Sequence, residues 1–167
     1  MGKRVMLRAE EPEGKRIGRL RGMDVYLEGD VGDYVIMLVL YGEKNRSGLR
    51  KVISKLSLST EYCRGAYHVD LMEVDQRYQG HGIAPLLYRY AMRKLGIVLQ
   101  AGVSQSAGGR KIWAQLAKMK DVTIFAAYAR GRKQAYMIEA EPEDEELEHE
   151  SIDLYDGREV YTFAIAA

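Results

Sequence analysis

The sequence predicts an α/β protein of the α+β kind, with one mixed, mainly antiparallel central sheet flanked by helices. Three observations lead to this fold class. Several segments of strand length come first, two helical segments follow with a strand between them, and further strands end the chain. The length of 167 residues suits a single domain over residues 1–167 with a sizeable core.

The first part of the chain predicts an arm and then strands joined by loops. Residues 1–15 are polar and charged and are expected to form a flexible arm or loop. The mixed segment from Ile17 to Glu28 predicts one strand. The run from Tyr34 to Tyr41 is continuously apolar, which is typical of a strand buried on both faces. Alternating apolar and polar residues from Leu49 to Thr60 predict a half-buried antiparallel strand.

The middle of the chain holds the strongest local pattern. Ala66 to Val74 predicts a strand, and a glycine-rich turn follows it. Ile83 to Leu95 predicts an amphipathic helix, because apolar residues recur at four-residue spacing on one face. Pro85 suits the first turn of this helix, where a missing N–H costs nothing, and Gly96 ends the helix.

The last third of the chain predicts a second helix among strands. A polar loop with N-cap residues precedes this helix, which is expected to run from Ser106 to Met119. The strands expected around it are Ile97–Val103, Val122–Tyr128, Ala135–Ile138 and Glu159–Ile165. An acidic loop at residues 139–151 precedes the last strand.

The acidic loop makes the charge distribution uneven. Eight acids and no Lys or Arg lie between Glu139 and Glu150, so the other residues carry an excess of positive charge although the net charge is +1. A basic body suits a phosphate-rich ligand, and it would also suit nucleic acid. The acidic run itself is either a solvated loop or a lip that attracts a cationic acceptor.

The composition favours a cytoplasmic protein. No apolar run approaches the ~20 residues that span a bilayer, and the basic N-terminus lacks the apolar segment of a secretory signal. The lone Cys63 excludes an intramolecular disulfide and a cysteine-based metal cluster. No membrane partner and no metal are therefore expected.

The glycine-rich turn is the best candidate for a binding site. Gly80 and Gly82 allow a ligand to approach the backbone closely. The turn leads into a helix N-terminus, where free N–H groups and the helix dipole attract phosphate oxygens. For two glycines alone, a tight turn without a ligand is the alternative.

The residues at this turn read Gln79-Gly80-His81-Gly82-Ile83-Ala84, between a predicted strand and a predicted helix. This run matches in full the pattern Q/R-x-x-G-x-G/A, so the chain resembles the GNAT superfamily of N-acetyltransferases, whose acetyl-CoA signature it is. A longer form of the signature is also met at Val74 and Tyr78, with Gln76 in place of the usual proline. The resemblance covers about residues 34–130. The segment S-Q-S-A-G-G-R-K-I-W is similar, more narrowly, to GNAT-like proteins encoded by bacteriophages.

The resemblance implies the GNAT fold, with acetyl-CoA (coenzyme A) as the cofactor. The pantetheine arm would pair like an added strand with the backbone of Met72 and Val74. A backbone N–H near Val74 would polarise the thioester carbonyl. The CoA pyrophosphate would lie on the backbone amides of the turn, which belong to Gln79, Gly80, His81, Gly82, Ile83 and Ala84.

The same resemblance implies direct attack of a neutral primary amine on acetyl-CoA, and this reaction needs a base. The strand before the turn offers His68, Asp70 and Glu73. Strict alternation along a strand puts His68 and Asp70 on one face and Glu73 on the other. Asp70 and Glu73 are preferred as bases, against the alternative that all three are polar groups on a half-solvated strand.

An acid for the departing thiolate is harder to assign. Many GNAT members carry a tyrosine on the second helix, and alignment of that helix puts Trp113 at its position. An indole N–H cannot act as an acid, so Trp113 is better interpreted as a core residue. The substitutes are Ser104, Ser106, Tyr88, Tyr128 or solvent, and Ser106 is kept among the catalytic candidates.

The resemblance thus predicts an acetyl-CoA-dependent N-acetyltransferase whose acceptor is a protein lysine or a small amine. The alternative is a catalytically weak GNAT scaffold that binds acyl-CoA or docks on a host protein. Nucleic acid is a less favoured partner, because basic and aromatic residues are not interleaved as in RNA-binding modules. Whether the chain forms a homodimer stays open. Its expected location is the cytoplasm, that of the host if a bacteriophage encodes it.

Overall fold

The computed structural model describes residues 4–61, 65–101, 106–130, 134–139 and 160–167. Its elements are β1 (Lys15–Leu20), β2 (Met23–Glu28), β3 (Val35–Lys44), β4 (Arg50–Ser59), β5 (Ala66–Val74), α1 (Ile83–Leu95), β6 (Val98–Gln100), α2 (Ala107–Ala117), β7 (Val122–Arg130), β8 (Gln134–Glu139) and β9 (Val160–Ala166). Cys63, Ser104 and all but the first residue of the predicted acidic loop lie outside the described residues.

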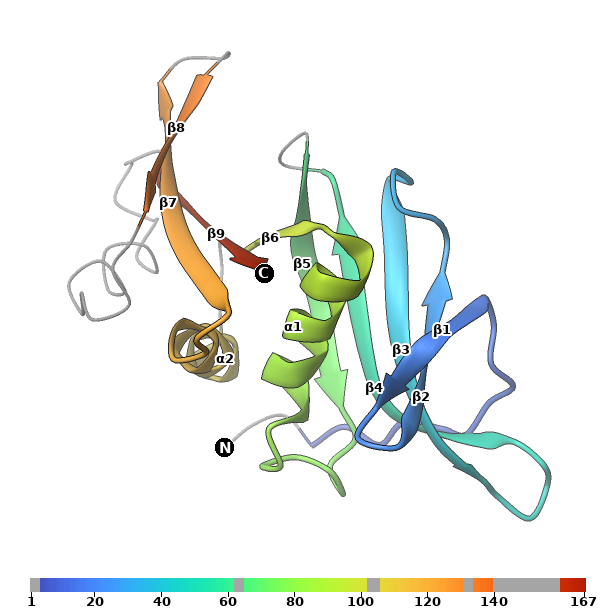
Figure 1. Cartoon of the computed structure of the whole chain (residues 1–167). Helices are drawn as coiled ribbons and strands as arrows, with labels where there is room; N and C mark the ends of the chain where they lie inside the picture. The colour runs from blue at the N-terminus through green and yellow to red at the C-terminus, as the bar shows by residue number, and fades with distance from the viewer. Residues whose placement is uncertain (1–3, 62–64, 102–105, 131–133, 140–159) are drawn as a thin grey trace.

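The described strands form one nine-stranded sheet with the order β1-β2-β3-β4-β5-β6-β9-β7-β8 (Figure 1). Each neighbouring pair is antiparallel except β5 and β6, which run parallel. The predicted mixed, mainly antiparallel sheet with two helices is therefore confirmed. β9 is last in the sequence but lies between β6 and β7, so the end of the chain completes the interior of the sheet.

Both helices pack into one core cluster on one face of the sheet. α1 has the predicted bounds and buries Leu87 and Ala91, because its apolar residues recur on one side. Gly96 follows α1 with a φ of 63°, the left-handed conformation that ends many helices. α2 begins after Ser106, whose side chain accepts a hydrogen bond from the Gly109 N–H, as expected of an N-cap.

The prediction of one strand over residues 17–28 is wrong, because this segment folds as the hairpin of β1 and β2. Leu20 pairs with Met23, so Arg21 and Gly22 form a two-residue turn with φ angles of 50° and 76°. Such a turn matches the twist of the flanking strands and usually carries Asn-Gly. The pair Arg-Gly is a poor sequence signal for such a turn. Hydrophobic periodicity alone therefore predicts one strand where the structure has two.

Residues 4–14 lie against the face of the sheet opposite the helices. Leu7 packs on a second core cluster there, formed by Val39, Tyr41 and Val52. An isolated β-bridge joins Glu10 to Arg50, and the Tyr41 hydroxyl donates a hydrogen bond to Glu10 at 2.8 Å. The centre of β3 is therefore buried on both faces, as predicted, although Val35 at its start is exposed.

Candidate active site

The turn that the sequence indicates connects β5 to α1 and is open to solvent. Gly80 and Gly82 have φ angles of 80° and 72°, a left-handed conformation that favours glycine. A Cβ atom placed on Gly80 would meet nothing within 4 Å in the described chain. No described side chain caps the N-terminus of α1, and its first turn holds no acid. Uncapped helix N–H groups at an exposed glycine turn can bind an anion such as phosphate.

Asp75 anchors the start of this turn. Its carboxylate is fully buried and accepts hydrogen bonds from the Leu7 N–H at 2.9 Å and from Nε of Arg77 at 2.7 Å. The hydrogen-bonded Arg77 guanidinium lowers the pKa of Asp75 to about 2. Because the Gln76 N–H also donates to the Val5 carbonyl, the end of β5 is tied to the N-terminal segment.

Arg21, which the sequence does not single out, reaches the turn from the β1–β2 hairpin. Its Nη1 donates a hydrogen bond to the His81 carbonyl at 2.5 Å, and its Nη2 would lie 3.9 Å from a Cβ placed on Gly82. Arg21 is the only described non-glycine residue with a positive φ. The missing side chain of Gly18 leaves room for the Tyr90 hydroxyl of α1, which lets the hairpin pack against the helix. The only local signal is an Arg-Gly dipeptide, and it says nothing about what the arginine contacts.

β5 has an open edge beside this turn. β6, which is shorter than the predicted strand, pairs with β5 only over residues 66–68, and no described strand pairs with that edge over residues 69–74. The pairing of β5 with β4 skips Asp70, which is the extra residue of a bulge. Bulges bend a strand and increase its twist. The bulge therefore coincides with the point at which β5 and β6 part.

The backbone at the end of β5 can hold an extended ligand. The Glu73 carbonyl accepts a hydrogen bond from Oγ of Ser54 on β4 at 2.9 Å. Because backbone groups alternate in direction along a strand, those of Met72 and Val74 are directed toward the open edge. The Val74 carbonyl accepts a hydrogen bond from Nε2 of Gln79 at 2.9 Å, so the open edge ends at the glycine turn.

The three candidate bases lie on the face of the sheet away from α1. Nδ1 of His68 and Oδ1 of Asp70 are 2.7 Å apart, which agrees with the common face expected for them. The expectation that Glu73 lies on the other face is wrong. Glu73 pairs with Lys55 of β4. His68 pairs with Ser59, and Ser59 lies on the same face of β4 as Lys55. Glu73 and His68 therefore share a face, because the bulge at Asp70 shifts the alternation of β5 by one residue.

The candidate acids have other structural roles. The Ser106 hydroxyl caps α2, with 3.1 Å between its oxygen and the Gly109 nitrogen. Trp113 is buried with its ring edge-on to Tyr88 at 6.3 Å between centroids, as expected of a core aromatic. Burial raises the pKa of Tyr88, so its phenol is a weaker acid than an exposed one. Ser104 and the side chain of Tyr128 lie outside the described parts of the chain.

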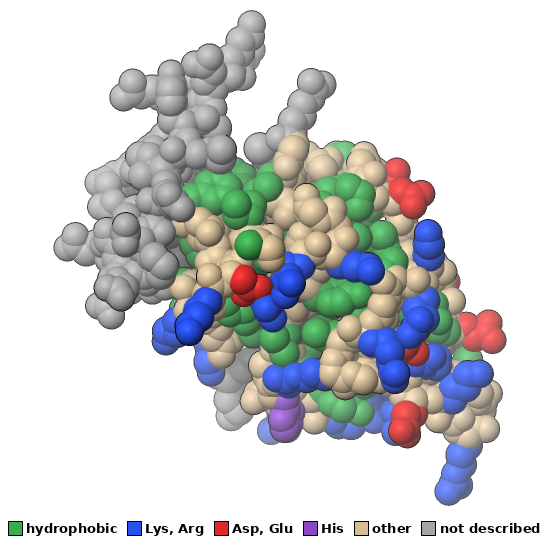
Figure 2. Space-filling model, in the orientation of Figure 1, with side chains coloured by type: hydrophobic (Ala, Val, Ile, Leu, Met, Phe, Trp, Pro, Cys, Tyr) green, Lys and Arg blue, Asp and Glu red, His purple; other side chains and the backbone are tan. Residues whose placement is uncertain are grey.

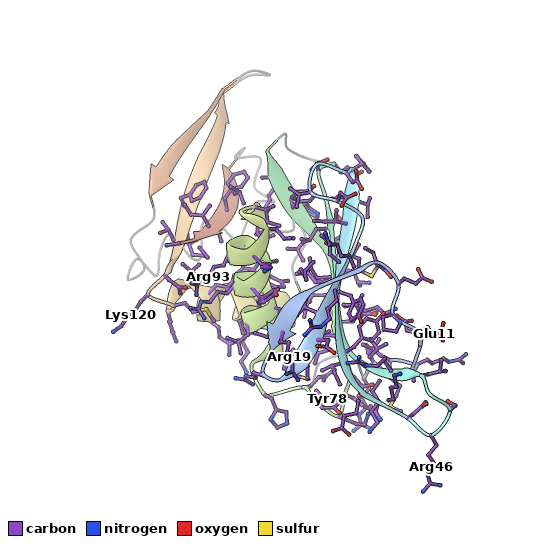
Figure 3. The ribbon with its side chains drawn as sticks, turned by 45° about the vertical axis from the view of Figure 1, so that its right-hand side comes forward. Glu11, Arg19, Arg46, Tyr78, Arg93 and Lys120 are labelled. Atoms are coloured by element: carbon purple, nitrogen blue, oxygen red, sulfur yellow. The ribbon has the colours of Figure 1, made fainter. Side chains whose placement is uncertain are left out.

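Basic side chains gather on the face that carries α1 and the β1–β2 hairpin (Figure 2). Two on α1 are neutralised: Arg89 and Arg93 pair with Asp121, at 2.7 Å and 3.6 Å. Arg21 instead contacts a carbonyl, and no carboxylate among the described residues pairs with it. Arg46, at the tip of the β3–β4 turn, points away from the body of the protein (Figure 3). The charge of Arg21 is thus directed at the glycine turn.

Within the described ranges, no three His, Cys, Asp or Glu side chains are grouped so that they could hold a metal ion. No helix in these ranges has the length and apolar character needed to span a membrane.

No protein-family model matches the chain, and no curated protein matches it.

Proposed function

We propose that this chain is an N-acetyltransferase of the GNAT type, which moves the acetyl group of acetyl-CoA to a primary amine. One observation carries the proposal: the 69–74 edge of β5, which no described strand covers, leads directly to the N-terminus of α1, which no described side chain caps. Coenzyme A has two matching parts, an arm with amide groups and a pyrophosphate. A strand edge suits the first part, and a helix N-terminus suits the second.

The pyrophosphate binds at the turn from Gln79 to Ala84. Its oxygens accept hydrogen bonds from the turn amides, since Gly80 and Gly82 expose the backbone. Arg21 adds a guanidinium directly beside these amides. Hydrogen bonds between arginine and phosphate are charge-assisted and are stronger than neutral ones.

The pantetheine arm pairs with the open edge through Met72 and Val74. Val74 contacts Gln79 at the turn, so it lies at the phosphate end of this edge. The arm extends from there toward the bulge at Asp70. We therefore expect the thioester nearer to Asp70 than to Val74. The N–H that polarises its carbonyl oxygen is then one of the bulged segment, and not one near Val74 as the sequence alone suggested.

The base is the pair of His68 and Asp70. Asp70 fixes the ring orientation through Nδ1 of His68. His68 takes a proton from the amine, the amine nitrogen attacks the thioester carbon, and the carbon–sulfur bond breaks. The thiolate has a pKa near ~8.5 when free, so solvent can protonate it and a dedicated acid is not essential.

The second candidate is a scaffold that binds acyl-CoA with little turnover. The position of Trp113 favours it, because the residue that aligns with the usual tyrosine is a buried aromatic packed on Tyr88. Such a protein would bind acetyl-CoA as tightly as an enzyme but transfer nothing.

Two measurements separate these outcomes. Calorimetry with acetyl-CoA reports binding, and incubation with acetyl-labelled CoA and a panel of amines reports transfer. Binding with transfer supports the enzyme. Binding without transfer to any amine leaves the scaffold, and absence of binding rejects both.

A further inference from the structure

Three polar side chains lie side by side where β5 and β6 meet. Ser59 of β4 pairs with His68 of β5, and His68 pairs with Gln100 of β6. Side chains of directly paired residues lie on the same face, about 5 Å apart. The adjacent residues Leu58 and Leu99 belong to the core beneath the helices. The polar row of Ser59, His68 and Gln100 is therefore on the opposite face.

Two members of the polar row are buried without a partner. Ser59 is 2% exposed and Gln100 is 1% exposed. In the part of the chain that the structure describes, neither Oγ of Ser59 nor Oε1 of Gln100 has a hydrogen-bond partner. Burying a polar atom without a hydrogen bond destabilises the folded state, so such atoms in folded proteins call for a specific explanation. Since Oε1 is only an acceptor, its missing partner is an N–H or O–H donor.

The polar row borders the place where the acetyl group is expected. β5 and β6 pair up to His68 and Gln100, and the open edge of β5 begins one residue later. Asp70 contacts His68 and its side chain is 32% exposed, so the histidine of the row has a solvent-accessible neighbour. An acceptor that enters past Asp70 would meet the end of the pantetheine arm at the fork of the two strands.

The surroundings of the polar row indicate the chemistry of the acceptor. Leu71 pairs with Ser57, lies on the same face as His68 and is 45% exposed, so its apolar side chain can be contacted from solvent on this face. Glu73 follows on this face opposite Lys55, whose ammonium is already bound to Glu10 at 3.1 Å. Glu73 and Asp70 together therefore attract a cation from solvent. An apolar contact beside two carboxylates fits a methylene chain that ends in an ammonium group.

We propose that the polar row is the acceptor site and that it takes an aliphatic primary amine, of the kind found in a lysine side chain or an alkylamine. The methylenes lie on Leu71. The ammonium first loses one proton to solvent. The neutral nitrogen then donates one N–H to Oε1 of Gln100 and Oγ of Ser59 and directs the other N–H at His68. It passes that second proton to His68 as it bonds to the thioester carbon. The carbon–sulfur bond breaks, and the thiolate regains a proton from solvent. The proposal rests on the proposed function for its chemistry, but the binding of the amine can be measured without acetyl-CoA.

The test uses n-butylamine as the probe, with n-butanol and butyrate as neutral and anionic analogues of equal chain length. Nuclear magnetic resonance of the His68 ring reports binding to the whole chain in the absence of acetyl-CoA. We expect n-butylamine to shift the His68 signals in a saturable way and to do so more strongly than n-butanol, while butyrate has no effect. Ser59→Ala and Gln100→Met should each weaken this binding about tenfold. Thr162→Val removes a buried polar group of β9 and is the matched control, with binding unchanged.

In turnover, the same two variants should raise KM for n-butylamine about tenfold and leave the dissociation constant of acetyl-CoA within twofold of that of the natural chain. The proposal is overturned if n-butylamine leaves the His68 signals unchanged, or if both variants bind it like the natural chain. Failure of acetyl-CoA to bind in calorimetry, with amine binding intact, would instead reject the proposed function and leave the amine site standing.

Discussion

Nη1 of Arg21 lies 2.5 Å from the carbonyl oxygen of His81, although 60 positions separate the two residues in sequence. One belongs to a hairpin turn, and the other belongs to the glycine turn before α1. The contact brings a guanidinium to a helix N-terminus that no described side chain caps. A positive side chain in that place opposes the helix dipole, and a bound phosphate would relieve this opposition. The contact therefore supports the proposed phosphate site at this turn.

Arg21→Asn should weaken acetyl-CoA binding about tenfold, because one charge-assisted contact to phosphate is lost. Asn is chosen since it favours the left-handed conformation of this turn, so the hairpin should stay folded. Calorimetry at low and at moderate salt checks the effect, and the loss should be larger at low salt. Arg46→Asn, in the exposed β3–β4 turn, is the control. Equal affinities for both variants would remove Arg21 from the phosphate site.

Gly82→Asp should abolish detectable acetyl-CoA binding, because it puts a carboxylate where the pyrophosphate is expected. The substitution also strains the backbone, since Gly82 has a φ of 72°. Gly48→Asp is the matched control: Gly48 has a φ of 83° in an open hairpin turn far from α1 in sequence. Both variants should lose about 1–2 kcal/mol of stability, but only the first should lose binding. Unchanged affinity of Gly82→Asp in calorimetry would refute the site.

Asp75→Asn should lower the free energy of unfolding at pH 7 by about 2 kcal/mol, because a fully buried, hydrogen-bonded carboxylate is lost. In the natural chain, Arg77 holds the pKa of Asp75 at about 2, below its ordinary 3.8. The stability from this group is therefore complete above about pH 4 and is lost as the pH falls toward 2. Denaturant unfolding as a function of pH checks this.

The Asp75→Asn variant should lose less unfolding free energy than the natural chain as the pH falls from 4 to 2, because it has no carboxylate at this position to protonate. Asp30→Asn, at an exposed loop position, should leave both the stability and its pH dependence as they are. An Asp75→Asn variant as stable as the natural chain at pH 7 would contradict the anchoring role.

Ser106 can be tested as a cap and as an acid separately. Ser106→Ala should cost about 1 kcal/mol of stability, because the N–H of Gly109 loses its partner. Ser106→Asp keeps an N-cap oxygen but has no hydroxyl. If the role is capping alone, Ser106→Asp should retain both stability and the rate of acetyl transfer. Loss of transfer in both variants, with Ser106→Asp still stable, would make the hydroxyl catalytic.

Local patterns in the sequence determined the centre of the fold. β5 and α1 have the predicted bounds because their signals are local: apolar residues at a fixed period, a proline in the first helical turn and a glycine after the last. The glycine turn between them was visible for the same reason. The hairpin of β1 and β2 was not, since its turn carries Arg-Gly rather than a common turn pair.

The tertiary structure alone decided how the candidate site is arranged. The bulge at Asp70 exists only in the pairing of β5 with β4, and it moves Glu73 to the face of His68. The polar row needs three strands in register, and the contact of Arg21 with His81 needs the hairpin to pack on α1. Periodicity fixes which residues of one element share a face, because that depends on backbone geometry within the element. Which elements meet, and in which register, depends on contacts between residues far apart in the chain, and no local pattern records them.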